Sequence, residues 1–378
     1  MVRSQVMGQA TSRVHIQHVL LSLQPGGLEN GVVNVVNRLD PARFQSSLCC
    51  LKIAGEFAAR VKRDDIAIHE FGWRGGNDIG LAWRLAKMFK QTRTDIVHTR
   101  NAEAFFYGFL GAKLAGVPHL IHSEHGRTFN DRRIRFFAQR QMSRFTDAIF
   151  AVSDQLKRDL VGHIGIPPSR IEVLYNGVDL QRFKSVDRAS IHAEWGVRPG
   201  EVVVGSVGRL VPVKNYPLLL RAVQAVPGCK LVLIGDGPER SGLTALAESL
   251  GIVDRVRFLG HREDVGSLLG AFDVFVLPSF SEGMSNTLLE AMAAGVAAVA
   301  SDVGGNGEIV RHEETGLLFP SDDLSVLRGH LERLTADAAL RARFAENGRR
   351  RALQAFDIGA MIKRYEDLYE RVASTTRG

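Results

Sequence analysis

The chain has 378 residues, of which 45% are hydrophobic and 24% charged, a composition typical of a soluble globular protein. This length exceeds one comfortable hydrophobic core, so we expect two domains. The formal charge of +7 is uneven, because residues 1–185 carry 26 Lys and Arg against 16 Asp and Glu, a net +10, whereas residues 186–378 carry 22 against 25, a net −3. The excess in the first half favours an anionic membrane surface or a phosphate-bearing lipid as partner over nucleic acid.

Three cysteines, Cys49, Cys50 and Cys229, lack the spacing of metal ligands and indicate core thiols in a reducing compartment. No apolar run approaches the roughly 20 residues needed to span a bilayer, since even the stretch 284–300 contains Glu290. We therefore expect a cytoplasmic protein, either soluble or peripheral on the inner face of the cytoplasmic membrane.

The first half alternates short apolar segments with longer segments of helical character. The expected strands are 14–23, 46–51, 96–99, 120–123 and 148–152, and the expected helices are 29–39, 79–89 and 102–114. Alternation of this kind predicts an α/β fold, with a parallel sheet covered by helices on both faces.

The segment 179–200 interrupts this rhythm and contains Pro199-Gly200, after which a second alternating unit begins. The expected parts are a first domain at 1–185, a linker at 186–200, a second domain at 201–355 and a C-terminal segment at 356–378. Within the last part, apolar residues at helical spacing predict an amphipathic helix at 358–372.

The strongest chemical signal is a pair of carboxylates, Glu282 and Glu290, around the start of an otherwise apolar helix. Glu282 follows the apolar run 274–277, which places it on a loop at the carboxyl end of a strand. Glu290 lies among Leu, Ala and Met, so its charge is expected to be buried and to need hydrogen-bond donors. Ribose or hexose hydroxyls supply such donors, and the N–H groups of the first helical turn suit a phosphate. The alternative is a loop carboxylate beside a Glu favoured by the helix dipole.

Two cations follow another expected strand, within 202–210. Arg209 lies at its end, and Lys214 follows five positions later, across a loop that contains Pro212. Ligands of open α/β sheets bind at this edge, where an Arg with a Lys matches the charge of a diphosphate. Two solvated surface charges are the alternative, but a second strand-end cluster suited to the same ligand favours a binding site.

Several motifs occur in the order found in one known family. They are Gly26-Gly-Leu-Glu-Asn30, 95–101, 123–126, 175–179, 208–214, 231–238, 256–262, and Glu282 with seven residues before Glu290. On these motifs, which extend over nearly the whole chain, the sequence resembles the retaining nucleotide-sugar glycosyltransferases of family 4. The resemblance implies the GT-B fold, in which two Rossmann-like doubly wound domains face each other across a cleft and the last helix crosses back to the first domain. The runs 26–34 and 98–101 further resemble a subgroup associated with bacterial exosortase and exopolysaccharide systems.

The resemblance implies that the second domain holds a UDP- or GDP-linked sugar. The matched residues are Glu290 for the ribose, Glu282, Met284 and Ser285 for the sugar, and Arg262 with the loop 235–238 for the base. A plain turn after a strand is the alternative for the 235–238 loop.

The first domain is expected to contribute three residues. Gly26 and Gly27 allow backbone N–H groups to approach the diphosphate when the cleft closes, although a plain tight turn is the alternative. His125, at the end of a strand, is the candidate for contacting the donor sugar and stabilising positive charge near the anomeric carbon. A structural histidine is the alternative for His125 and the expectation for His98.

Breaking the anomeric bond builds negative charge on the leaving phosphate. Arg209 and Lys214, with N–H groups near Asn286, Thr287 and Leu288, can neutralise that charge. One enzyme class instead uses a metal held by Asp-x-Asp, and this sequence has no two aspartates spaced two apart. We therefore expect neither metal nor cofactor. The resemblance further implies front-face attack with retention, in which the departing phosphate takes the acceptor's proton.

The acceptor side is less defined. The segment 132–145 interleaves five arginines with Phe136, Phe137, Met142 and Phe145, a pattern that fits either a helix on an anionic membrane or one with a core-facing side. We expect acceptor contacts there and in Glu29-Asn30, with a glycan or lipid-linked acceptor in bacterial polysaccharide or envelope synthesis. The alternative functions are a nucleotide-sugar epimerase of the same fold and a non-catalytic sugar-nucleotide-binding protein.

Overall fold

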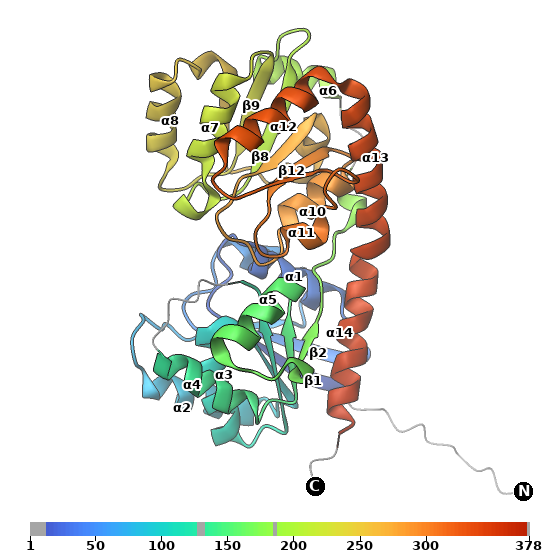
Figure 1. Ribbon diagram of the computed structural model, residues 1–378. Helices are drawn as coiled ribbons and strands as arrows, with labels where there is room; N and C mark the ends of the chain where they lie inside the picture. Colours follow the sequence, from blue (N-terminus) through green and yellow to red (C-terminus); the bar gives the residue numbers. More distant parts are fainter. Residues whose placement is uncertain (1–12, 127–132, 184–186, 376–378) are drawn as a thin grey trace, which may run out of the picture.

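The computed structural model describes residues 13–126, 133–183 and 187–375, which form two α/β lobes stacked one above the other (Figure 1). The first lobe contains a seven-stranded sheet of order β3-β2-β1-β4-β5-β6-β7, and the second a six-stranded sheet of order β10-β9-β8-β11-β12-β13. Neighbouring strands pair parallel in both sheets. The predicted two-domain, doubly wound α/β fold is confirmed.

The first lobe alternates strands with covering helices. Its strands are β1 (Val14–Leu20), β2 (Phe44–Cys50), β3 (Ala67–Glu70), β4 (Ile96–Arg100), β5 (His119–Glu124), β6 (Ala148–Ala151) and β7 (Ile171–Val173). Its helices are α1 (Gly27–Arg38), α2 (Ile79–Gln91), α3 (Asn101–Ala115), α4 (Arg133–Ser143) and α5 (Asp154–Asp159), with a short 3-10 segment η1 (Glu56–Arg60). The central strands are buried along their length, because helices cover both faces of a parallel sheet.

The second lobe repeats this arrangement. Its strands are β8 (Val202–Val207), β9 (Cys229–Ile234), β10 (Val256–Gly260), β11 (Val274–Leu277), β12 (Ala297–Ser301) and β13 (Leu317–Phe319). Its helices are α6 (Arg188–Trp195), α7 (Tyr216–Ala225), α8 (Arg240–Ser249), α9 (Val265–Leu268), α10 (Asn286–Ala293), α11 (Asn306–Ile309), α12 (Leu324–Ala336) and α13 (Ala338–Ala355). The strand order reverses at β8, between β9 and β11, so the crevice where ligands of such sheets bind lies at the ends of β8 and β11.

The segment expected as a linker, 186–200, contains a helix of the second lobe. Asp187 caps α6 by accepting a hydrogen bond from the Ser190 N–H, and Trp195 at its end is 2% exposed. The Trp195 ring packs against Phe272, with 5.7 Å between ring centroids. This segment therefore belongs to the second lobe, and the connection between the lobes is shorter than the sequence indicated.

The chain crosses between the lobes twice, and the two crossings are hydrogen-bonded to each other. The Val178 N–H donates to the Phe356 carbonyl at 2.8 Å, and the Ile358 N–H donates to the Val178 carbonyl at 3.2 Å. Beyond this point, α14 (Ile358–Ala373) runs along the first lobe, as Figure 1 shows. Its apolar face includes Tyr365 and Tyr369 and packs into the core beneath β1 and β4, so the last helix lies against the first lobe.

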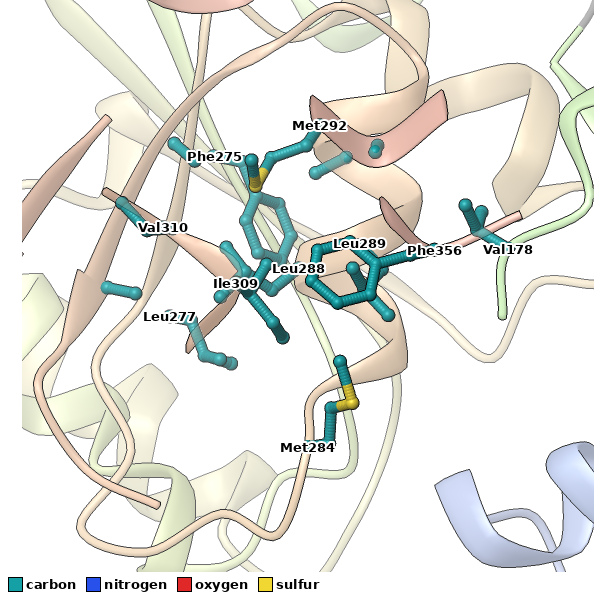
Figure 2. Packing of buried hydrophobic residues seen from close by; sticks show 14 of the residues in the cluster. Val178, Phe275, Leu277, Met284, Leu288, Leu289, Met292, Ile309, Val310 and Phe356 are labelled. Carbon is teal, nitrogen blue, oxygen red and sulfur yellow. The ribbon is translucent and has the colours of Figure 1, made fainter. Parts of the chain in front are cut away.

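Helix α10 lies in the core of the second lobe next to this double crossing. Leu288, Leu289 and Met292 point into a cluster that also contains Phe356 and Val178, as Figure 2 shows. Burying each such side chain contributes about 1.5–3 kcal/mol, so α10 is firmly held while its first turn faces the cleft. None of the helices in the described part of the chain is both long and apolar enough to span a bilayer.

Candidate active site

The two strand-end motifs of the second lobe meet, as their positions predict. Lys214, after β8, places its Nζ 2.6 Å from Oε1 of Glu282, which lies on the loop between β11 and α10. The hydroxyl of Ser279 donates to the same carboxylate oxygen at 2.6 Å. Both ionic side chains are largely removed from solvent, with 20% and 12% of their surface exposed. The ammonium group therefore points into the crevice at the carboxyl ends of the strands.

Glu290 is largely but not fully removed from solvent, with 18% of its side-chain surface exposed, and a protein side chain supplies its donor. Arg182 NH1 lies 3.5 Å from Glu290 Oε1. Burial raises the pKa of Glu290, and the positive charges of Arg182 and then Arg60 act in the opposite direction. Arg60 comes from η1 of the first lobe, so a carboxylate expected to bind ribose faces cations from outside its own domain.

The start of α10 is capped and touches the first lobe. Ser285 Oγ accepts a hydrogen bond from the Leu288 N–H at 3.3 Å, which satisfies one donor of the first helical turn. The side-chain amide of Asn286 donates to the Gly27 carbonyl across the cleft at 2.9 Å. Thr287 is next in this turn, and its hydroxyl lies 3.2 Å from that of Ser285.

Met284 lies beneath this turn and not on its surface. Only 6% of the residue is exposed, and its sulfur accepts a hydrogen bond from the Asn176 N–H at 3.2 Å. Its side chain therefore belongs to the core cluster of Figure 2.

The glycine loop of the first lobe faces the cations of the second. Gly26 precedes α1, and a Cβ there would lie 2.2 Å from Glu29 Oε2, so any side chain at this position would displace the Glu29 carboxylate. The Glu29 carboxylate is thus folded back onto the helix start. Burial raises its pKa, while its own backbone N–H and the charge of Arg209 act to lower it. Arg209, exposed at the end of β8, therefore acts on the first-lobe loop across the cleft.

His125 lies against the loop that carries Glu282. A Cβ on Gly283 would lie 2.0 Å from the His125 carbonyl oxygen, so the two lobes meet here backbone to backbone. The His125 N–H donates to Asn101 Oδ1 at 2.9 Å, and its ring nitrogen Nε2 lies 3.3 Å from Arg100 NH1. Burial, followed by the charge of Arg100, holds the pKa of His125 well below its usual range. The imidazole is therefore neutral at physiological pH.

The residues expected around the base lie farther along the sheet. Gly235 follows β9, and a Cβ there would lie 2.1 Å from the Gly208 carbonyl oxygen, so the loop 235–238 packs beside Arg209. Arg262 follows β10 and forms two hydrogen bonds to Asp264, at 2.8 and 2.7 Å. The loop 235–238 therefore lies next to Arg209, whereas the Arg262 guanidinium is bound to Asp264.

A polar cavity of about 680 Å³ lies between the lobes against the Glu282 loop, with Ser281 and Glu282 in its lining. First-lobe residues of α5, including Gln155 and Arg158, line it together with Asp302 and Glu308 of the second lobe. The Glu308 carboxylate spans the gap by accepting the N–H groups of Asp154 and Gln155, both at 2.8 Å.

Sequence reasoning missed Arg182, Arg60 and Arg100. None of them belongs to a pattern with its partner, because each meets Glu290 or His125 only after the chain has folded. Arg100 belongs to the segment 95–101, one of the motifs of the family resemblance. Its position in the sequence did not indicate that its side chain is buried. His98 is buried with both ring nitrogens hydrogen-bonded, to Tyr369 and Ser123, in line with its expected structural role.

Two family models match the chain, one in each lobe. The model described as Glycosyltransferase Family 4 matches residues 25–182, and the model described as Glycosyl transferases group 1 matches residues 187–351. The chain is also 33% identical over 332 residues to a D-inositol 3-phosphate glycosyltransferase of Rhodococcus erythropolis, with 82% of this chain and 71% of the relative aligned. The chain belongs to glycosyltransferase family 4. As a member of this family, it transfers a sugar from a nucleotide sugar.

Further relatives and solved structures agree. The UDP-Gal:alpha-D-GlcNAc-diphosphoundecaprenol alpha-1,3-galactosyltransferase of Escherichia coli is 29% identical over 304 residues, covering 75% of this chain and 77% of the relative. The Anabaena protein HepE, solved with UDP and glucose, superposes with a TM-score of 0.85 at 23% identity, over 95% of this chain and all of HepE. WaaG, a glycosyltransferase involved in lipopolysaccharide biosynthesis, superposes with a TM-score of 0.73 at 18% identity, over 95% of this chain and all of WaaG. These two structures support the GT-B fold of this glycosyltransferase.

Proposed function

We propose that this glycosyltransferase moves a hexose, with retention of anomeric configuration, from a UDP- or GDP-linked donor to a glycan or lipid-linked acceptor in bacterial polysaccharide or envelope synthesis. The observation that carries the proposal is the meeting of Lys214 with Glu282 beside His125, where both lobes and both strand-end motifs converge. A sugar bound there has a carboxylate for its hydroxyls and a cation for its diphosphate. HepE, solved with UDP-glucose, and the galactosyltransferase of Escherichia coli make UDP the first donor nucleotide to test.

The donor lies across the first turn of α10 in this proposal. Arg209, Lys214 and the N–H groups of Asn286 and Thr287 neutralise the diphosphate, and no metal or cofactor is required. Glu290 accepts the ribose hydroxyls once Arg182 has moved aside. The glycine loop at Gly26 and Gly27 approaches the diphosphate from the other lobe.

The remaining contacts follow the same geometry. Glu282 and the backbone of Met284 and Ser285 hold the hexose, the loop 235–238 contacts the base through its backbone, and Arg262 reaches the base only after leaving Asp264. His125 contacts the hexose as a neutral imidazole.

In the proposed front-face reaction, the acceptor oxygen forms a bond to the anomeric carbon as the bond from that carbon to the phosphate oxygen breaks. The leaving diphosphate receives the acceptor's proton. Lys214 and Arg209 stabilise the charge that builds on this oxygen, because preorganised cations in a dry cleft stabilise a transition state strongly. Closure of the lobes around Asn286 and Gly283 excludes water, which would otherwise hydrolyse the donor.

We further propose a cytoplasmic location with peripheral attachment to an anionic membrane through α4. The exposed face of this helix carries Ile134 and Phe137, which are 68% and 59% exposed, beside Arg133 and Arg140. Exposed apolar side chains among arginines fit a helix lying in a lipid interface. Arg132, part of the same sequence pattern, lies outside the described residues. Membership of the subgroup associated with exosortase systems stays a prediction from the motifs.

One experiment tests the reaction. The protein is incubated in EDTA with UDP- and GDP-linked hexoses and a polyprenyl-diphosphate acceptor, and nucleoside diphosphate, product linkage and anomeric configuration are followed. We expect release of nucleoside diphosphate coupled to an α-linked product. Conversion of the donor to its epimer would indicate the epimerase, and tight nucleotide binding with no turnover would indicate a binding protein.

A second experiment tests the membrane. Flotation with vesicles of phosphatidylglycerol, compared with vesicles of phosphatidylcholine, is expected to recover the protein only with the anionic lipid. The variant Phe137→Ser/Ile134→Ser should lose this recovery while keeping turnover of a soluble acceptor. Equal recovery of variant and wild type would contradict a role for α4.

A further inference from the structure

Arg100, the last residue of β4, holds a buried positive charge among neutral groups. The residue is 2% exposed, and its guanidinium approaches His125 Nε2 at 3.3 Å, His18 Nδ1 at 3.4 Å and the Tyr365 hydroxyl at 3.2 Å. Its Nε has no hydrogen-bond partner, and no ion pair to it forms among residues 13–126, 133–183 and 187–375. A buried cation without a counter-charge lowers the stability of the fold. Stabilisation of the fold therefore does not explain why an arginine occupies this position.

The direction of the hydrogen bonds around His125 assigns its ring proton. A guanidinium can only donate, so His125 Nε2 accepts from Arg100 and carries no proton. In a neutral imidazole the proton must then lie on Nδ1. The low pKa of His125, caused by burial and next by Arg100, keeps the ring in this neutral form.

A second chain of hydrogen bonds accommodates the same tautomer. Ser123 Oγ lies 3.0 Å from His125 Nε2 and 3.1 Å from His98 Nε2, and His98 Nδ1 lies 2.8 Å from the Tyr369 hydroxyl. Burial raises the pKa of Tyr369, so this hydroxyl remains a donor. Read in one direction, Tyr369 donates to His98, His98 to Ser123 and Ser123 to His125. In this direction Arg100 and Ser123 both donate to Nε2, and Arg100, which can only donate, sets the direction and leaves Nδ1–H as the donor.

The residue after Arg100 fixes the backbone of the same histidine. Asn101 has a φ of 63°, a left-handed conformation that costs energy for any residue with a side chain. Its Oδ1 accepts the His125 N–H at 2.9 Å. Two consecutive side chains at the end of β4 therefore hold His125, one by its ring and one by its backbone.

We propose that Arg100 is a positioning residue that fixes His125 as the neutral Nδ1–H tautomer, turned so that this N–H donates to a hydroxyl of the bound sugar. The inference rests on the proposed function in one respect, namely that His125 contacts the donor sugar. Tyr365 supports Arg100 from α14, with the guanidinium 5.5 Å from the centre of its ring, so the C-terminal helix takes part in holding the site.

Without Arg100, the Ser123 hydroxyl is the remaining partner of Nε2. A hydroxyl can accept as well as donate, so the ring is then free to take up the other tautomer, which presents a lone pair to the sugar hydroxyl. A misplaced or misprotonated contact of this kind costs up to about a hundredfold in rate. The contact orients the sugar in the transition state and adds little to nucleotide binding, which the second lobe provides. The expected signature is a lower kcat with a KM for the donor within about threefold of the wild type.

The variant Arg100→Met tests the assignment, because methionine fills similar space without the charge. Nitrogen-15 NMR of histidine-labelled protein, with no donor present, reports the tautomer directly, and His125→Ala identifies the His125 resonances. We expect the Nδ1–H signature in the wild type and a mixture of tautomers in Arg100→Met, with kcat reduced about a hundredfold. The melting temperature should not fall, because the variant removes an uncompensated buried charge. Arg350→Met, on the exposed face of α13, is the control for loss of an arginine.

The results separate this inference from the proposed function. A wild-type tautomer in Arg100→Met would assign the proton to Ser123 and overturn the inference, as would unchanged turnover. A fall in melting temperature with an unchanged tautomer would show a merely structural residue. If no nucleotide sugar is turned over, or if His125→Ala remains fully active, the proposed function or the role of His125 fails, while the NMR comparison still tests what Arg100 does.

Discussion

Lys214 Nζ lies 2.6 Å from Glu282 Oε1, although 68 residues separate them in the chain. The pair joins the end of β8 to the loop after β11, the two strand ends that flank the reversal of strand order in the second sheet. Ser279 holds the same carboxylate oxygen, so the carboxylate is fixed before any ligand arrives. A cation and a carboxylate preorganised at this edge suit the charged and the hydroxylated halves of a nucleotide sugar.

Removing the cation from this pair should abolish most turnover. We expect Lys214→Met to lower kcat about 10²–10³-fold, because a preorganised charge on the leaving group acts mainly in the transition state. Glu282→Ala should lose turnover too, since it removes both the sugar contact and the partner of Lys214. Initial rates of nucleoside diphosphate release measure both variants. Lys363→Met, in an exposed ion pair on α14, serves as the control. Wild-type rates in Glu282→Ala would refute the assignment of the sugar site.

The raised pKa of Glu290 predicts a pH dependence of nucleotide binding. Ribose hydroxyls donate to the ionised carboxylate, so affinity for UDP should fall as the pH drops from neutral into the raised titration range of Glu290. Glu290→Gln should bind UDP more weakly at neutral pH and show a smaller change with pH. Calorimetric titration of both proteins between pH 7 and about pH 5 isolates this carboxyl, because the phosphate of UDP titrates equally in both. Parallel curves would argue against the ribose contact.

The carboxyl group of Glu290 also affects folding stability, and this effect has the opposite dependence on pH from UDP binding. A folded-state pKa above the unfolded value means that the folded protein binds the proton more tightly. The stabilisation from Glu290 is therefore complete below the unfolded pKa and is lost as the pH rises through the folded one. As the pH rises through this range, we expect the free energy of unfolding of the wild type to fall relative to that of Glu290→Gln. Denaturant titrations at several pH values measure it.

The sequence predicted those parts of the molecule that depend on local pattern. Alternating apolar segments defined both sheets, and the positions of Glu282 and Lys214 after strands were enough to place them at one edge. Contacts between residues from distant parts of the chain could not be predicted. Arg182 meets Glu290 only because the chain crosses between the lobes near Val178, and no spacing encodes that distance. The helix α6 was hidden because its polar residues and the following Pro199-Gly200 resemble a linker, while the burial of Trp195 depends on Phe272, far along the chain.

Gly283 should be essential for closure of the lobes. Any side chain there collides with the His125 carbonyl, since a Cβ would lie only 2.0 Å from that oxygen. We expect Gly283→Ala to keep the fold of each lobe and to bind UDP with nearly normal affinity, because the nucleotide contacts belong to the second lobe. Turnover should fall at least tenfold, since the sugar contact of His125 is lost. Small-angle scattering should show a larger radius of gyration.

A glycine in open space provides the matched control for this substitution. A Cβ on Gly329, in α12, meets nothing within 4 Å, so Gly329→Ala should leave turnover unchanged and stabilise the helix by about 1 kcal/mol. Full activity of Gly283→Ala would show that the His125 turn can withdraw without consequence, and the proposed contact between His125 and the sugar would then be untenable.

Glu308 should control how far the lobes open in the absence of substrate. Its carboxylate accepts the N–H groups of Asp154 and Gln155 at the start of α5, so it links the second lobe to the first on the side of the cavity. Removing a carboxylate that satisfies such N–H groups costs about 1 kcal/mol, which corresponds to roughly a fivefold shift between closed and open forms. We expect Glu308→Ala to increase the distance between labels on α2 and α12 in fluorescence energy transfer measured without donor. Saturating UDP-sugar should restore most of the closed distance, because the donor bridges both lobes. An unchanged distribution of distances in Glu308→Ala would mean that the other contacts between the lobes, including those at Gly27 and Gly283, determine the angle between them.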